Sequence, residues 1–330
     1  MNETPTMLRT WLARIEKKAQ EVGLDFFPQE FVICSGDKIA EKEAYFGGYA
    51  LYPHWSFGKN FFLGNVLYNF RAQFFPNEIV INTNPCRAYL LETNPVVHNI
   101  QIAAHVFAHN DFFKHNVAYQ STHPELIQAQ LRQGTRLIKN YIGNPRIGER
   151  KVEKIIDMAH AVCYVVDDQD NFLIDFALRY FPKLEPVERE ILQVVATFTH
   201  HLWPQFKTQI MNEGWATYWH HRIFTELADD IIHTFGFDAY FKALRSHLSV
   251  IRMPEGLRRI NPYRIGFFTW QKIKQEVQNA EALFSIRANK TDFTFLDDHF
   301  DGKDFIYERF VRPAIIEPRL RKKPKLSEEK

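Results

Sequence analysis

The stretch at residues 104–116, AHVFAHNDFFKHN, carries side chains that could bind a metal ion. We expect it to lie in a helix that begins just after Pro95. His105 and His109 are four residues apart, so they lie about 40° apart on one helix face and can point at the same atom. Because a histidine pair among large apolar residues needs partners for its ring nitrogens, this spacing indicates a candidate metal site.

A second polar stretch, MNEGWATYWHHR at residues 211–222, could supply a third ligand. Glu213 and His220 are seven residues apart, which places them about 20° apart on one helix face. If this helix packs against the first, Glu213 can meet His105 and His109. A His-His-Glu set with a position open for water is typical of catalytic zinc and other divalent-metal hydrolase sites, and iron or manganese could also bind there.

A hydrolase at this site would need its own groups for proton transfer. The zinc-protease motif H-E-x-x-H places a glutamate directly after the first histidine, and that position is Val106 here. The remaining candidates for a general base are Asp111, Glu213 itself, His160 and His220. We expect His220 to bind the developing oxyanion or a fourth metal position. A di-iron bundle would require about four carboxylates in two E-x-x-H pairs, so a single metal is favoured.

The same residues also allow a purely structural interpretation. The spacing H-x-x-x-H is common in helices, and Asn110, Asn212 and backbone carbonyls could satisfy the histidines within a polar network in the core. His160 follows Asp157 by three residues, so the carboxylate could orient the ring, but a buried histidine beside an exposed aspartate fits as well. His54 is either a half-buried histidine bonded to backbone or part of a site.

The elements that would position these groups are mostly helical. Apolar positions recur at helical spacing in residues 6–22, 124–141, 149–166, 186–201, 206–234, 237–251, 262–278 and 291–312. Residues 77–82 predict a strand, residues 26–33 a strand or an extended lead, and residues 86–91 a short helical piece. We therefore expect a mainly α fold, a multi-helix single globular domain with one or two short strands, in which a helical zincin-like metal site is possible.

Composition limits the function classes. The chain has 330 residues, 45% of them hydrophobic, and a net charge of only +2, so it can bury one large core and has no feature typical of nucleic-acid binding. It has no apolar stretch of about 18 residues and no signal pattern, so we expect no membrane span and a cytoplasmic location. Cys34, Cys86 and Cys163 are too scattered for a zinc knuckle or a disulfide frame. Residues 1–312 would form the domain, followed by a basic, disordered tail at 313–330.

Five motifs resemble those of the SpoVR family, named for stage V sporulation protein R. They are YPHWSFGK at 52–59, EIVINTNPCRAYLLETN at 78–94, AHVFAHNDFFKHN at 104–116, IMNEGWATYWHHRI at 210–223 and NPYRIGF at 261–267. They occur in the family's order over about residues 26–312. The resemblance implies a cytoplasmic protein linked to spore cortex formation or, in bacteria that do not sporulate, to stress and stationary-phase programmes.

The family's motif positions fall on a defined set of residues in this chain. They are His54, Trp55, His105, His109, Asp111, Asn116, His160, Asn212, Glu213, Gly214, Trp215 and His220. Two departures stand out. Residues 199–203 read THHLW where a richer run of tyrosine and phenylalanine is expected. The chain also stops soon after Val311, as in a short member that lacks the usual C-terminal region.

Together these features predict a metal-dependent hydrolase, acting on an amide or peptide bond that could be cell-wall related. His105, His109 and Glu213 would hold a divalent metal, zinc first and iron or manganese as alternatives. The substrate would be a small molecule or a peptide. The alternative is a non-catalytic regulatory or scaffold protein, in which the same residues form a polar network and a protein partner binds the aromatic surface.

Overall fold

The computed structural model describes residues 3–45, 49, 51–60, 78–167, 169–251, 261–277, 279–300 and 302. Most of these residues lie in helices, and the described strands form one three-stranded sheet, which confirms the predicted mainly α, single-domain fold. The predicted tail at 313–330 lies outside the described residues. Within the described part of the chain, no helix is both long and apolar enough to cross a membrane.

The helices follow one another with short connections. Their bounds are α1 Glu3–Glu21, α2 Gly36–Ala44, α4 Val96–His115, η1 Val117–Tyr119, α5 Ile127–Gly143, α6 Gly148–Val162, α7 Leu173–Tyr180, α8 Pro186–Lys207, α9 Gln209–Glu226, α10 Ala228–Phe235, α11 Phe237–Val250, α12 Pro262–Glu276, α13 Ala280–Asn289 and α14 Asp292–His299. The single helix predicted over 206–234 is wrong, because that span holds the end of α8 and then α9 and α10 as separate helices.

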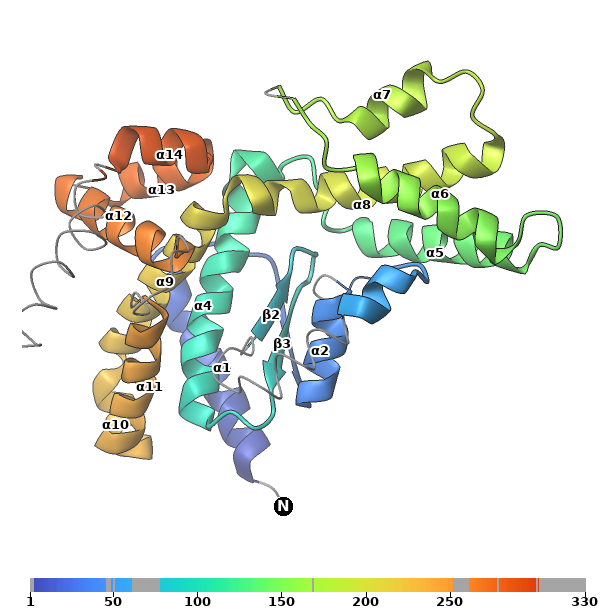
Figure 1. Cartoon of the computed structure of the whole chain (residues 1–330). Coiled ribbons are helices and arrows are strands. Elements are labelled where there is room, and N and C mark those ends of the chain that lie inside the picture. The colour runs from blue at the N-terminus through green and yellow to red at the C-terminus, as the bar shows by residue number, and fades with distance from the viewer. Residues whose placement is uncertain are drawn as a thin grey trace, which may run out of the picture.

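The sheet has the strand order β1-β3-β2, with bounds β1 Gln29–Cys34, β2 Glu78–Ile81 and β3 Cys86–Leu91. β1 runs parallel to β3, and β2 runs antiparallel to it. The helical piece predicted at 86–91 is therefore wrong, since this segment is the central strand. Five of its six residues are buried, and a strand buried on both faces has no alternating pattern to mark it. The sheet lies between α4 and α2 (Figure 1).

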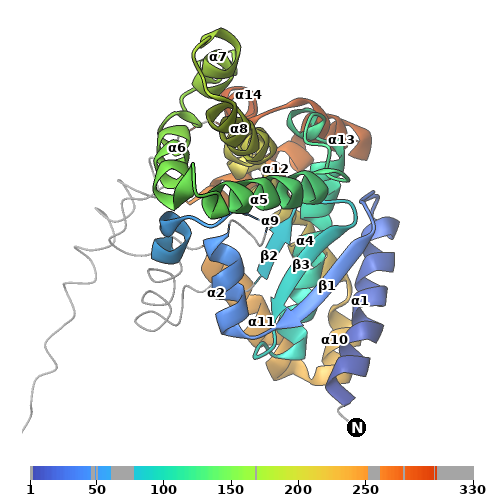
Figure 2. The ribbon, with the colours of Figure 1, turned by 90° about the vertical axis from the view of Figure 1, so that its right-hand side faces the viewer.

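Helix α4 forms the centre of the molecule. It begins after Pro95, as predicted, and is buried on nearly every side because α1, α9 and the sheet all pack against it (Figures 1 and 2). α9 is likewise buried between α4 and α12. The long contact between α4 and α9 brings the two predicted motifs face to face.

A second hydrophobic core lies in the group of α5, α6 and α8, which extends to one side of the sheet (Figure 1). Its buried residues include Tyr49, Tyr52 and Phe57, from the segment that follows α2, and Ile156 and Phe198 from α6 and α8. The core around α4 and α9 is a separate cluster. The chain therefore builds two aromatic cores, and each holds polar groups of its own.

Candidate metal centre

Three predicted ligands meet where α4 contacts α9. The Nε2 atoms of His105 and His109 lie 3.0 Å apart. Glu213 Oε2 lies 3.7 Å from His105 Nε2 and 3.5 Å from His109 Nε2. The two histidines come from successive turns of α4, and the glutamate reaches them from α9, as the spacing predicts. These residues form the one group of three candidate metal ligands found among the described residues.

The distances within this His-His-Glu cluster fit a small divalent cation. Four ligand atoms placed tetrahedrally at 2.0–2.1 Å from zinc are about 3.3 Å from one another. The three observed separations, 3.0, 3.5 and 3.7 Å, bracket that value. A cation could therefore be coordinated after side-chain movements of a few tenths of an ångström.

The Nδ1 atoms of His105 and His109, which point away from the cluster, contact other side chains that orient both rings. His109 Nδ1 donates a hydrogen bond of 2.9 Å to the amide oxygen of Asn212, which leaves its Nε2 with a lone pair toward the cluster. His105 Nδ1 lies 3.1 Å from His220 Nδ1. The structure thus brings His220 to the cluster, but it contacts the rear of His105 rather than the side that faces Glu213. This is the arrangement of residues that orient metal ligands.

Burial shapes the electrostatics of the cluster. His105 and His109 are 5% and 6% exposed to solvent, whereas the side chain of Glu213 is 21% exposed. Burial acts to raise the pKa of Glu213, but the neighbouring His109 and His105 outweigh it and hold that pKa well below its usual range. The carboxylate is therefore ionised and suited to a cation, and its partial exposure leaves a route to solvent.

Aromatic rings from α12 and from α4 itself stack on the two histidines of the cluster. Tyr263 on α12 stacks on His105 with ring centroids 6.3 Å apart, and Phe113 stacks on His109 at 6.0 Å. Tyr263 was not among the predicted site residues. The signal was present, because Asn261 caps α12 and Pro262 occupies its first turn, which fixes where Tyr263 enters the helix.

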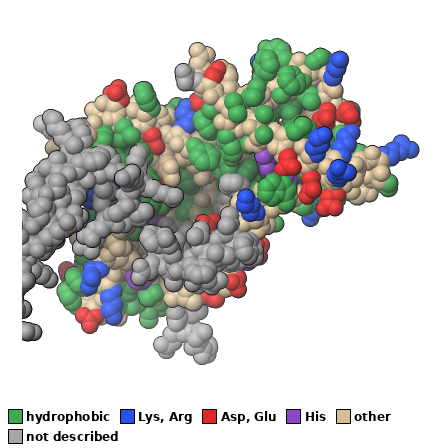
Figure 3. Space-filling view, in the orientation of Figure 1, with side chains coloured by type: hydrophobic (Ala, Val, Ile, Leu, Met, Phe, Trp, Pro, Cys, Tyr) green, Lys and Arg blue, Asp and Glu red, His purple; other side chains and the backbone are tan. Residues whose placement is uncertain are grey.

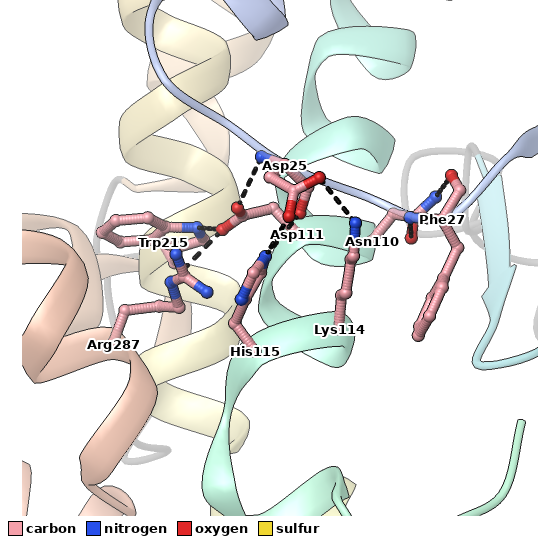
Figure 4. A network of polar contacts seen from close by, with 8 residues as sticks. All are labelled: Asp25, Phe27, Asn110, Asp111, Lys114, His115, Trp215 and Arg287. Atoms are coloured by element: carbon pink, nitrogen blue, oxygen red, sulfur yellow. Dashed lines mark hydrogen bonds and ion pairs between the residues drawn. The ribbon is translucent and has the colours of Figure 1, made fainter.

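Asp111, a predicted proton-transfer residue, lies in a different network (Figure 4). Its Oδ1 accepts a hydrogen bond from the Asp25 backbone, and its Oδ2 accepts one from Trp215 Nε1 and lies 3.4 Å from Arg287 Nε. Burial raises the pKa of Asp111 to about 6, although Arg287 opposes the shift. Asp111 therefore joins α4, α9 and α13, and the structure does not bring it to the His-His-Glu cluster.

His160, the other predicted proton-transfer residue, belongs to the second core. Its Nε2 lies 2.7 Å from the Tyr52 hydroxyl. Asp157 does not orient it as the spacing allows, because that carboxylate accepts a hydrogen bond from Trp55 Nε1 and lies 3.3 Å from His54 Nε2. His160 and His54 are thus not part of the His-His-Glu cluster, and His54 is bonded to side chains rather than only to backbone.

The fold and the His-His-Glu cluster define the class: a mainly helical protein with a candidate metal centre between two buried helices. The SpoVR like protein family matches residues 2–172 and 165–309, so the chain belongs to the SpoVR family. A protein of Escherichia coli (strain K12), named "Uncharacterized protein YcgB", is 30% identical over an alignment of 333 positions that covers 83% of this chain. The chain spans 64% of that relative's length. No solved structure matches the chain.

Proposed function

We propose that this SpoVR-family protein is a metal-dependent hydrolase whose single divalent cation is held by His105, His109 and Glu213. The observation that carries the proposal is the convergence of two Nε2 atoms and one carboxylate oxygen at separations of 3.0–3.7 Å. With both rear nitrogens acting as donors, two Nε2 lone pairs would face each other, and a cation between them would remove that repulsion.

The chemistry follows from these ligands. The cation would polarise a carbonyl oxygen and lower the pKa of water, with zinc the first choice and iron or manganese the alternatives. Asn212 and His220 would orient the two imidazoles. Among the predicted proton-transfer groups, Glu213 and His220 are the two that lie at the cluster. We therefore assign proton transfer to the second oxygen of Glu213, and substrate binding to its partly exposed side.

We propose an amide or peptide bond as the target, with cell-wall peptides as the first substrates to test, since the family name refers to sporulation. The full chain is stripped with a chelator, reloaded with zinc, iron(II) or manganese(II), and incubated with peptidoglycan fragments that are then analysed by mass spectrometry. Cleavage that needs the metal, persists in His115→Ala and is lost in His105→Ala and Glu213→Gln supports the proposal. Stoichiometric metal without cleavage of any fragment would contradict hydrolysis of this substrate class.

A second candidate is a non-catalytic scaffold, favoured by an exposed aromatic surface at α7. Phe176, Tyr180 and Phe181 are 50–58% exposed, and hydrophobic side chains gather on that part of the molecule (Figure 3). Such a patch is typical of protein interaction sites. Recovery of a stoichiometric partner by metal-free protein, lost in Phe176→Ser with Tyr180→Ser, would favour this function. Equal recovery by both proteins would exclude the α7 surface.

A further inference from the structure

The second core holds a small pocket that the metal chemistry does not use. Its volume is about 230 Å³, and it lies where the segment at 51–57 meets α6 and α8. Its walls are mostly aromatic and apolar, including Tyr52, Phe57 and Phe198, with the hydroxyl-bearing Ser56 and the ring of His160 also facing it. A pocket of this size and composition suits a small, largely apolar group.

The proton positions on His54, beside this pocket, can be worked out from its partners. The backbone N–H of Ser56 lies 3.4 Å from His54 Nδ1, and a backbone N–H can only donate. His54 Nδ1 is therefore an acceptor, and the ring proton sits on Nε2. It follows that the Ser56 hydroxyl, 2.7 Å from the same Nδ1, donates its proton to the ring.

The other side of the ring faces a fixed carboxylate. His54 Nε2, which carries the proton, lies 3.3 Å from Asp157 Oδ1, and the same oxygen accepts a 2.9 Å hydrogen bond from Trp55 Nε1. Asp157 is carried by α6 and so does not depend on the loop that holds His54. The Ser56 hydroxyl is thus hydrogen-bonded to the imidazole, the Asp157 carboxylate lies 3.3 Å beyond the other ring nitrogen, and the ring has the tautomer that can accept the hydroxyl proton.

We propose that Ser56, His54 and Asp157 form an acyl-transfer site that hydrolyses small carboxylic esters bound in this pocket. Ser56 Oγ attacks the carbonyl carbon while its proton passes to His54 Nδ1. The bond to the leaving alcohol then breaks, and the alcohol takes that proton. Water attacks the acyl-serine in the same way: its proton goes to His54, the bond to Ser56 breaks, and Ser56 regains a proton. Asp157 stabilises the imidazolium at each stage.

Two properties of the surroundings agree with this assignment. Burial lowers the pKa of His54, against the opposing charges of Asp157 and Glu153, so the ring is neutral and can accept a proton. Asn60 also lines the pocket, and its amide can donate to the carbonyl oxygen of a bound ester. The ring of His160, which lines the pocket, stands edge-on to His54, with ring centroids 4.8 Å apart.

The test uses a fluorophosphonate probe, which phosphonylates activated serines, on the purified full chain in the presence of EDTA. We expect one phosphonyl group per chain, located on Ser56 by peptide mass spectrometry and absent from Ser56→Ala. His54→Gln should slow labelling by about 100-fold or more. Ser121→Ala, which changes an exposed serine, should label like the wild type. Hydrolysis of p-nitrophenyl acetate should be equally fast in the wild type and Ser121→Ala, slower in His54→Gln and absent in Ser56→Ala.

The result is independent of the metal proposal. His105→Ala should label at the wild-type rate, so failure of one proposal leaves the other intact. Two outcomes would overturn the acyl-transfer site: a folded wild-type chain that stays unlabelled at Ser56, or a folded His54→Gln variant that labels as fast as the wild type. Either would mean that the contact between Ser56 and His54 only caps the local chain.

Discussion

Gly214 on α9 and Gly266 on α12 meet backbone to backbone beside the candidate metal centre. A Cβ atom added to Gly214 would lie 2.3 Å from Gly266 Cα, and one added to Gly266 would lie 2.1 Å from the Ile210 carbonyl oxygen. Real Cβ atoms do not approach other atoms so closely, so α9 and α12 can pack at this distance only with glycine at both positions. Glu213 directly precedes the contact.

Gly214→Ala should therefore destabilise the fold by about 3 kcal/mol, because the backbone of α12 must move away. Urea unfolding followed by circular dichroism measures the change. Gly143→Ala is the matched control, since a Cβ there meets nothing within 4 Å, and it should leave stability nearly unchanged. Equal stability of both variants would mean that α9 and α12 are not in contact at this point.

Asn212→Ala tests whether the rear hydrogen bond orients His109. Removing the 2.9 Å contact to His109 Nδ1 should weaken zinc binding by about 10–100-fold without abolishing it. Competition with a chromophoric chelator measures the affinity. The conservative Asn212→Gln variant tests whether an amide oxygen within reach of Nδ1 is sufficient, and part of the affinity should return. An affinity unchanged in Asn212→Ala would contradict the assigned role.

Asp111→Asn should act on stability rather than on the metal. The substitution removes the charge that pairs with the buried Arg287. It also places an amide donor against either the Trp215 Nε1–H or the Asp25 backbone N–H, and together these changes should cost about 3 kcal/mol or more. Zinc stoichiometry should remain that of the wild type. Asp25→Asn, at an exposed ion pair with Lys114, should cost less than about 1 kcal/mol. Loss of metal from folded Asp111→Asn would place Asp111 at the centre instead.

His201 should make the fold sensitive to acid. Its Nδ1 donates to the Thr122 carbonyl and its Nε2 accepts from the Tyr49 hydroxyl, so the ring is held neutral, and burial lowers its pKa to about 4. Between its unfolded pKa of 6.5 and about pH 4, the unfolded chain binds a proton that the folded chain does not. This contribution to stability is therefore fully present above pH 6.5 and is lost as the pH falls through 4.

His201→Gln can keep both hydrogen bonds but cannot titrate. Between pH 7 and pH 4 the wild type should therefore lose roughly 3 kcal/mol of unfolding free energy relative to His201→Gln. Urea unfolding at a series of pH values measures this difference. His123→Gln, at an exposed position, should parallel the wild type. A difference that stays constant with pH would mean that His201 is not buried in its neutral form.

The sequence predicted the meeting of His105, His109 and Glu213 because helical periodicity fixes which side chains share a face, and both helices carry their polar groups on the contact side. It could not separate these residues from Asp111 and His160. Asp111 is two residues beyond His109, which turns it to another side of α4. The position of His160 depends on how α6 packs against the rest of the molecule, and local sequence spacing does not predict that packing.

The strand β3 also could not be predicted from local sequence. Cys86–Leu91 contains alanine, arginine and leucine, which favour helix, and it becomes a strand because β1 and β2 both pair with it. β1 comes from more than 50 residues earlier in the chain. Tertiary pairing therefore overrode local propensity. Helix starts were easier to predict, because a capping asparagine or a first-turn proline favours a helix start through its own local geometry and hydrogen bonds.

We propose that the His-His-Glu cluster holds one divalent metal ion. The most direct measurement is elemental analysis of the purified full chain, loaded with zinc, iron(II) or manganese(II), beside His105→Ala, Glu213→Gln and the control His115→Ala. His115 lies on the same helix but bonds to Asp25, away from the cluster. We predict about one equivalent of metal in the wild type and in His115→Ala, and none in the other two variants, with all four folded by circular dichroism. A wild type that binds no metal after loading would show that these three residues do not form a metal site.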